Sequence, residues 1–116
     1  MANKRIIKIT CVLANWCPHC NPTTTDVLAK FKKELNVPVI ILDIDDFDQE
    51  KIADDIVQKY GDWSSDYLIP QVFFEYSDGE VQHIFTGFSE GVSVTRKAWD
   101  SLLDSSFYKE LLEQVN

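Results

Sequence analysis

The sequence predicts an α/β fold in which a four-stranded mixed sheet is flanked by three helices. An apolar, β-branched run is followed by a helical pattern and a second apolar run, which is typical of a β-α-β unit. Further along, Asp78-Gly79 separates two strand-like runs and indicates an antiparallel hairpin. The chain has 116 residues, of which 45% are hydrophobic, as expected of one small domain. We therefore expect a single domain that spans residues 1–116.

The β-α-β unit is predicted to occupy the first part of the chain. Ile6–Leu13 is the first strand, and residues 37–44, which follow Asn36 and Pro38, form the second. The helix between them is indicated by four apolar residues at helical spacing: Val27, Leu28, Phe31 and Leu35. Its two flanking strands are apolar enough to be buried.

The rest of the chain is predicted to form a helix, the hairpin and a last helix. An amphipathic helix begins after the acidic residues 45–48 and ends at Gly61. The hairpin strands are residues 72–76 and 81–86. Apolar residues at helical spacing then continue from residue 94 to residue 115, with a bend or a second cap at residues 104–106. No repeat or linker interrupts this order.

A pair of cysteines, Cys17 and Cys20, lies where the first strand gives way to the first helix. Two thiols at this spacing can form a reversible disulfide, which is redox chemistry. The first thiol of the pair meets unpaired backbone N–H groups and the positive end of the helix dipole, which stabilise its thiolate. We therefore expect Cys17 to be the attacking sulfur and Cys20 the resolving thiol, with His19 adding charge near Cys17.

Charge and cysteine content limit the partners and the compartment. A net charge of −8 argues against nucleic-acid binding, which needs a basic surface. Residues 1–5 lack the apolar stretch of a signal peptide and no transmembrane run follows, so we expect a cytoplasmic protein that does not enter membranes. A leader removed from a longer precursor would leave the same sequence. Three cysteines are unlike a structural disulfide framework, and in a reducing cytosol a close pair is catalytic or metal-binding.

Several motifs at corresponding relative positions resemble the thioredoxin superfamily along essentially the whole chain. Trp16 followed by the cysteine pair resembles its W-C-x-x-C motif, Ile69-Pro70 resembles its cis-proline dipeptide, and Gly87 resembles the glycine after its hairpin. The resemblance implies a thioredoxin-like minimal fold of glutaredoxin size, with strand order 2-1-3-4. It also implies an enzyme, a thiol-disulfide oxidoreductase that reduces or oxidises protein disulfides and exchanges electrons with a reductase or another thiol donor. Neither a cofactor nor a bound metal is expected, and the protein is expected to be a monomer.

The resemblance assigns further residues to the site. The backbone of Ile69 beside a cis Pro70 would pair with an extended substrate segment, and Trp16 and Gly87 would line the same surface. A trans proline that opens an edge strand is the alternative, but the nearby cysteine pair favours the cis form, which costs only about 0.5–1 kcal/mol before proline. Pro18, together with the histidine that follows it, would tune the thiolate, and resembles the central dipeptide of strongly oxidising disulfide donors.

Other features depart from the thioredoxin pattern. Cys11 stands where the family has a buried aspartate, and Ile41 stands near the position of the lysine across from it, so proton transfer would need water or the histidine of the motif. The segment 61–68 is longer than its thioredoxin counterpart. Its Trp63 and Tyr67 either shape substrate access or anchor the loop to the core, and anchoring is favoured because aromatic residues in loops usually pack.

The start of the first helix is ambiguous in the sequence. Asn21-Pro22 is typical of an N-cap and first turn, which would begin the helix after the cysteines. The family fold argues for a start at Cys17, in which case Pro22 removes one hydrogen bond and kinks the helix. We predict the start at Cys17 and the kink.

Alternatives remain for the function and for the third cysteine. The chain could be a thioredoxin-fold binding module with slow or no turnover, or a metal-binding protein, although one cysteine pair supplies too few ligands for a closed zinc site unless two chains share it. Cys11 could exchange with Cys20, but a small buried hydrophobic residue is the favoured interpretation. No function is assigned to His83.

Overall fold

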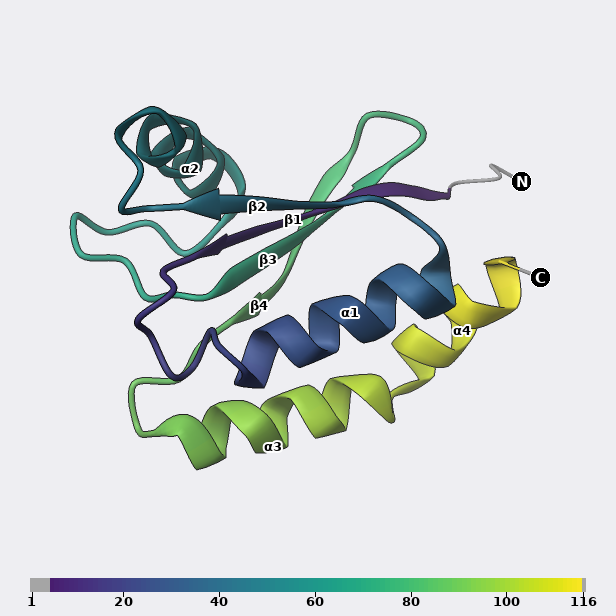
Figure 1. The fold of residues 1–116 in the computed structure, drawn as a ribbon. Coiled ribbons are helices and arrows are strands. Elements are labelled where there is room, and N and C mark those ends of the chain that lie inside the picture. Colours follow the sequence, from purple (N-terminus) through teal and green to yellow (C-terminus); the bar gives the residue numbers. More distant parts are fainter. Residues whose placement is uncertain (1–4, 116) are drawn as a thin grey trace.

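Four strands and four helices make up residues 5–115, the part of the chain that the computed structural model describes (Figure 1). The segment of residues 1–4, on which the expectation of no leader peptide depends, lies outside the described residues, as does residue 116. In chain order the elements are β1 (Ile6–Leu13), α1 (Thr23–Leu35), β2 (Val39–Asp43), α2 (Phe47–Tyr60), β3 (Gln71–Tyr76), β4 (Val81–Thr86), α3 (Val92–Leu103) and α4 (Ser106–Val115).

The strands form one mixed sheet in the order β2-β1-β3-β4. β1 runs parallel to β2 and antiparallel to β3, and β4 runs antiparallel to β3. The predicted α/β class and the predicted strand order are therefore confirmed. The central position of β1 explains its composition, because a strand with neighbours on both sides and helices on both faces is buried over most of its length, here from Ile9 to Leu13.

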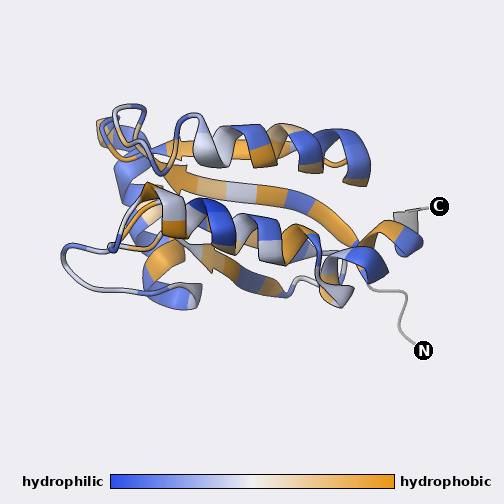
Figure 2. Ribbon diagram, turned by 90° about the horizontal axis from the view of Figure 1, so that it is seen from below, coloured by the Kyte–Doolittle hydropathy of each residue, from blue (hydrophilic) through white to orange (hydrophobic). Residues whose placement is uncertain are grey.

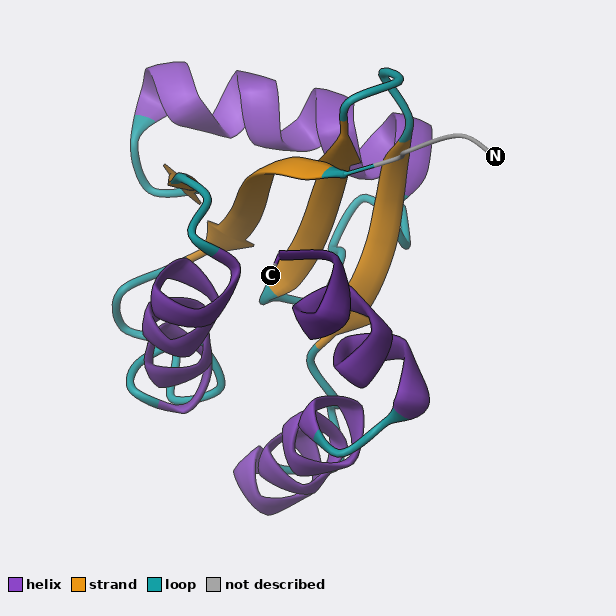
Figure 3. Cartoon of the chain, turned by 90° about the vertical axis from the view of Figure 1, so that its right-hand side faces the viewer, coloured by secondary structure: helices purple, strands orange, loops and turns teal. Residues whose placement is uncertain are grey.

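The helices cover the two faces unequally: α2 lies alone on one face, and α1, α3 and α4 lie on the other (Figure 3). Side chains of β1 alternate between these faces. Ile9 and Cys11 pack with α1 and α3, whereas Val12 packs with Ala53 and Val57 of α2. Figure 2 accordingly shows hydrophobic residues along the strands and a mixture of hydrophobic and hydrophilic residues along the helices.

The predicted number of three helices is wrong, because the last helical stretch is divided into α3 and α4. The division lies at the bend that the sequence indicates. The Ser105 hydroxyl accepts a hydrogen bond from the backbone N–H of Tyr108, which caps the start of α4, while the N–H of Asp104 still donates to Asp100 at the end of α3. A serine that caps a new helix satisfies N–H groups that would otherwise lack partners, so a second helix begins there.

The predicted start of the first helix at Cys17 is also wrong, since α1 begins at Thr23. Residues 17–21 form a separate turn, in which the carbonyl of Cys17 accepts hydrogen bonds from the N–H groups of Cys20 and Asn21. Pro22 has no N–H with which to continue this ladder, and it occupies the N-cap position of α1. The proline therefore separates a turn from a helix and does not kink a continuous one. The Asn21–Pro22 peptide bond is cis.

The remaining boundaries follow the local sequence signals. Asp46 caps α2 by accepting hydrogen bonds from the N–H groups of Asp48 and Gln49, and the N–H of Gly61 donates to Val57 at its end. Gly79 in the β3–β4 turn has a φ of +91°, which favours glycine. The predicted hairpin and second helix are thus confirmed. β2 is shorter than the predicted 37–44, and the prediction that it is buried is wrong, because β2 lies at the edge of the sheet and Ile40 and Ile41 are 41% and 40% exposed.

Candidate active site

The two paired cysteines lie on one turn just beyond the carboxyl end of β1. The N–H of Cys17 donates to the carbonyl of Ala14 at 3.1 Å, and the carbonyl of Cys17 accepts the N–H of Cys20 at 3.0 Å. Both thiols are free. Cys17 is only 6% exposed and Cys20 is fully buried. The expected nucleophile, Cys17, is therefore largely covered by the rest of the protein.

The environment distinguishes the two sulfurs. Burial raises the pKa of the Cys20 thiol to about 12; a hydrogen bond with the backbone of Ala14 lowers it, and a hydrogen bond with the Cys17 side chain raises it further. Cys20 is therefore protonated at neutral pH, and its side chain is hydrogen-bonded to that of Cys17. The predicted stabilisation of a Cys17 thiolate by the N-terminus of the first helix loses its premise, because α1 begins at Thr23, six residues after Cys17.

The third cysteine lies in the same buried cluster, on β1. Cys11 is fully buried, and burial first, then the nearby Cys20, raises its pKa well above the ordinary value. It is paired in register with Ile41 of β2. Cys11 therefore places an uncharged thiol, and no carboxylate, beneath the active-site turn.

Helices α1 and α3 hold this turn through two buried threonines that the sequence analysis did not identify. His19 Nδ1 lies 2.7 Å from the hydroxyl of Thr95, which also accepts the N–H of Phe88 at 2.9 Å. The hydroxyl of Thr24 donates to the carbonyl of His19 at 2.7 Å and accepts the indole N–H of Trp99 at 2.9 Å. The orientation of the His19 ring and the position of its backbone are thus both fixed by side chains from elsewhere in the chain.

The Ile69–Pro70 peptide bond is cis, as expected. Gln71, the next residue, pairs with Val12 near the end of β1, so the proline lies at the cysteine end of the sheet. Ile69 packs against the cluster that contains both cysteines. The structure therefore brings the two motifs together, although they are about 50 residues apart in the sequence.

Gly87 lies against this proline segment. Its N–H donates to the carbonyl of Pro70 at 2.9 Å, and a Cβ at this position would lie 2.7 Å from the carbonyl oxygen of Ile69 and 2.8 Å from Cδ of Pro70. Only glycine fits there without a shift of the backbone. The glycine thus has a packing role that is independent of the substrate contact implied by the resemblance.

Trp16 and Pro18 form the exposed rim of the turn. Trp16 is 68% exposed, and its indole N–H donates to a carboxylate oxygen of Asp45 at 2.8 Å. This bond holds the ring toward the loop between β2 and α2. Pro18 is exposed next to the nearly buried Cys17, so any partner that reaches this sulfur also meets both side chains.

The buried amide of Gln71 holds both ends of the segment 61–68. Its oxygen accepts the N–H of Asp62 at 3.1 Å, and its nitrogen donates to the carbonyls of Asp62 at 3.1 Å and Leu68 at 3.0 Å. Tyr67 donates its hydroxyl to Asp54 of α2 at 2.7 Å, and burial, followed by this bond, raises the Tyr67 pKa. Tyr67 therefore anchors the segment, as expected, whereas Trp63 is 44% exposed and does not.

Replacement of Gln71 by leucine is expected to lower the free energy of unfolding by about 2–3 kcal/mol, because three backbone groups lose a buried partner. Chemical denaturation measures this loss. Gln58→Leu, on the exposed side of α2, is the matched control and should change stability by less than about 0.5 kcal/mol. Equal effects of the two substitutions would contradict the role of the amide.

His83, which the sequence analysis left without a function, belongs to a polar cluster on β4. Its Nε2 lies 2.6 Å from the hydroxyl of Thr86, and that hydroxyl donates to the Asp62 carboxylate at 2.7 Å. This cluster ties β4 to the start of the segment 61–68. Its function is to fix the loop, since none of its members belongs to the cluster around the cysteines.

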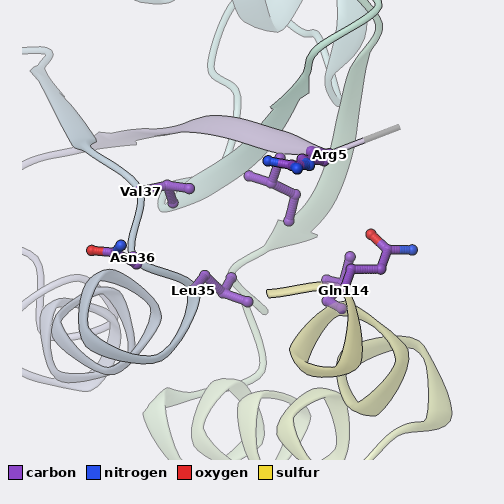
Figure 4. Close-up of a pocket in the computed structure, with 7 residues that line it drawn as sticks. Arg5, Leu35, Asn36, Val37 and Gln114 are labelled. Carbon is purple, nitrogen blue, oxygen red and sulfur yellow. The ribbon is translucent and has the colours of Figure 1, made fainter. Parts of the chain in front are cut away.

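A cavity of about 340 Å³ lies at the other end of the molecule, where β1 begins and α1 ends (Figure 4). Arg5, Asn36 and Gln114 are the polar residues that line it. None of the residues predicted for the site is among them, so the candidate active site remains at the cysteine end of the sheet.

Two further findings concern the chemistry and setting of the site. Within residues 5–115, no three histidine, cysteine, aspartate or glutamate side chains lie close enough together to hold a metal ion. Over the same residues, no helix combines the length and the apolar character needed to cross a bilayer.

No family model, curated protein or solved structure matches the chain.

Proposed function

We propose that the chain is a thiol-disulfide oxidoreductase with a thioredoxin-like fold, acting on protein disulfides in the cytoplasm. The observation that carries this proposal is the pair of free thiols on one turn, with the side chain of the buried Cys20 hydrogen-bonded to that of Cys17. The cis peptide bond at Ile69–Pro70 beside this turn supports the same function. A purely structural pair of thiols needs neither feature.

The reaction proceeds by two exchanges. The thiolate of Cys17 attacks one sulfur of the substrate disulfide, the substrate S–S bond breaks, and the leaving sulfur takes a proton. Cys20 then loses its proton and attacks the Cys17 sulfur of the mixed disulfide, which releases the second substrate thiol. The substrate gains two electrons and the Cys17–Cys20 pair loses them, and a reductase or another thiol donor restores the dithiol.

The remaining site residues act on the substrate and the thiolate. An extended segment of the substrate pairs with the backbone of Ile69 next to Pro70, and Trp16 and Gly87 lie on the same surface. Pro18 and His19 modulate the thiolate of Cys17; the ring of His19 is held by Thr95 for this purpose.

The test is the reduction of insulin disulfides in the presence of dithiothreitol. The wild type is expected to accelerate it, and Cys17→Ser is expected to fall to the uncatalysed rate. Cys11→Ala, which removes a thiol that is buried outside the pair, is the control and should retain most of the rate. A wild type no faster than the reductant alone, or a Cys17→Ser variant that keeps its activity, would refute the proposal.

A second candidate function, a binding module with slow turnover, is favoured by two features of the site. Cys17 is 6% exposed and Cys11 occupies the position of a proton-transfer carboxylate, and both features slow exchange. A Cys17–Cys20 disulfide that forms and is reduced reversibly, without turnover of insulin, would support the binding module. Stoichiometric zinc in the purified protein would instead support a metal site shared between two chains.

A further inference from the structure

A hollow of about 330 Å³ opens beside the cysteine turn, between α2 and the segment 61–68. Figure 1 shows this segment, in teal, leaving the same end of the sheet as the purple loop that carries the cysteines. Residues from three parts of the chain line the hollow, including Trp16 from the cysteine loop, Glu50 and Asp54 from α2, and Trp63, Asp66 and Tyr67 from the segment. We call this hollow the acidic groove. One of its lining residues, Trp16, directly precedes Cys17 in the sequence.

Aromatic rings form much of the wall of the acidic groove. Trp63 and Tyr67 pack against each other with ring centroids 5.6 Å apart, and the Tyr67 hydroxyl is held by Asp54. The Trp16 ring is held by its bond to Asp45. Trp16 and Trp63 are nevertheless 68% and 44% exposed, so their faces are available to a ligand. Fixed and exposed aromatic faces of this kind attract cations.

The carboxylates of the groove are available as well. Tyr67 engages Asp54, but within residues 5–115 no salt bridge joins Glu50 or Asp66 to a cationic side chain. Residues 43–66 contain nine acidic residues and two lysines, so this stretch carries a net charge of −7 of the −8 of the whole chain. The negative charge is therefore concentrated in α2 and the segments beside it, three of whose carboxylates line the groove, and is not spread evenly over the sequence.

The ligand that this surface fits is an organic cation. A metal ion would need several ligands at one point, and the described residues contain no such cluster. A lysine or arginine side chain has an apolar stem that can lie against aromatic rings and a charged end that can reach two separated carboxylates. Because the groove adjoins the active-site turn, that side chain would come from the segment that carries the reacting cysteine.

We propose that the acidic groove binds a lysine or arginine side chain that flanks the disulfide in the protein substrate. This inference rests on the proposed function and names its substrate class: disulfides in basic segments. Trp16 and Trp63 contact the stem, and Glu50 and Asp66 pair with the charge.

The first experiment measures binding without any exchange chemistry. Two short peptides carry serine in place of cysteine. In the basic peptide, arginine and lysine flank the serine; in the neutral peptide, glutamine replaces both. Their affinities for the reduced protein are measured by tryptophan fluorescence, to which the two groove tryptophans contribute. The basic peptide is expected to bind about tenfold more tightly at low ionic strength, with the difference decreasing as salt screens the charges.

Charge-matched variants locate the binding site. Glu50→Gln combined with Asp66→Asn is expected to abolish most of the preference for the basic peptide. Asp100→Asn combined with Glu113→Gln removes the same charge from exposed positions on α3 and α4. This control variant should retain the preference for the basic peptide. Equal affinities of the wild type for both peptides, no binding of the basic peptide, or equal losses in the two variants would each overturn the proposal. Thermal unfolding of each variant confirms that it is folded.

A second experiment separates this inference from the function on which it rests. Disulfide-linked versions of the two peptides are reduced by the protein, and the second-order rate constants are compared. A higher rate for the basic disulfide supports both proposals. Equal rates and equal affinities refute the groove while the exchange function stands, and preferential binding without any reduction refutes the exchange function while the groove stands.

Discussion

Replacement of Cys20 by serine is expected to stop turnover and to leave Cys17 joined to its substrate in a stable mixed disulfide. Cys20 is fully buried and is held by its hydrogen bonds to Ala14 and Cys17, so in the wild type it lies where it can attack the Cys17 sulfur. A serine hydroxyl cannot displace a thiol from a disulfide. Non-reducing electrophoresis and mass spectrometry measure the adduct, which should approach one substrate per chain.

The other cysteine variants are controls for this result. Cys17→Ser should form no adduct, and Cys20→Ser combined with Cys11→Ala should form as much adduct as Cys20→Ser alone. If the adduct requires Cys11, then Cys11 and not Cys17 is the reacting sulfur. If Cys20→Ser turns over at the wild-type rate, the assignment of Cys20 as the resolving thiol is wrong.

The largest expected loss of stability is that of Trp99→Ala, about 3–5 kcal/mol. The Trp99 ring is 1% exposed, stacks on Phe85 with centroids 3.7 Å apart, meets Phe31 edge-on at 5.8 Å, and bonds to Thr24. Removal of the ring leaves a cavity between α1, α3 and the sheet and removes one of the two hydrogen bonds of the Thr24 hydroxyl. Since small domains are stable by only about 5–15 kcal/mol, the variant should be close to unfolding at 37 °C.

Two substitutions of tryptophan provide the comparison. Trp63→Ala removes the same side chain from a position that is 44% exposed and should lower the free energy of unfolding far less. Trp99→Phe keeps an aromatic ring but loses the bond to Thr24, and its loss should be intermediate. All three are measured by chemical denaturation. A loss for Trp99→Ala no greater than that for Trp63→Ala would contradict the central role of this ring.

The sheet was predictable because its signals are local. Apolar runs marked all four strands, and Asp78-Gly79 marked the hairpin. The two wrong helix predictions concern helix ends, where a single residue can decide whether a helix begins, continues or stops. Pro22 carries a local signal for a helix that begins after the cysteines, whereas the family resemblance predicts a start at Cys17, and the helix begins at Thr23. Ser105 was visible as a cap, but a bend within one helix was equally compatible with the pattern.

The site was predictable only in part, for a related reason. The cysteine pair and Ile69–Pro70 are motifs that can be recognised in the sequence itself. Thr24, Thr95 and Gln71 were missed, because each acts through a partner that only the fold brings near: Thr95 lies 76 residues from His19. In the sequence, these three polar residues within apolar patterns could have indicated buried hydrogen bonds.

The uneven placement of acidic residues has a consequence for how the molecule meets its partners. With nearly all the excess negative charge in residues 43–66, which include α2, the α2 face of the sheet is more negative than the face covered by α1, α3 and α4. A positively charged protein that diffuses toward it is turned before contact, so that a larger fraction of collisions occurs at the correct orientation. Encounter with neutral or acidic proteins gains nothing from this steering, and selection among partners therefore begins at a distance.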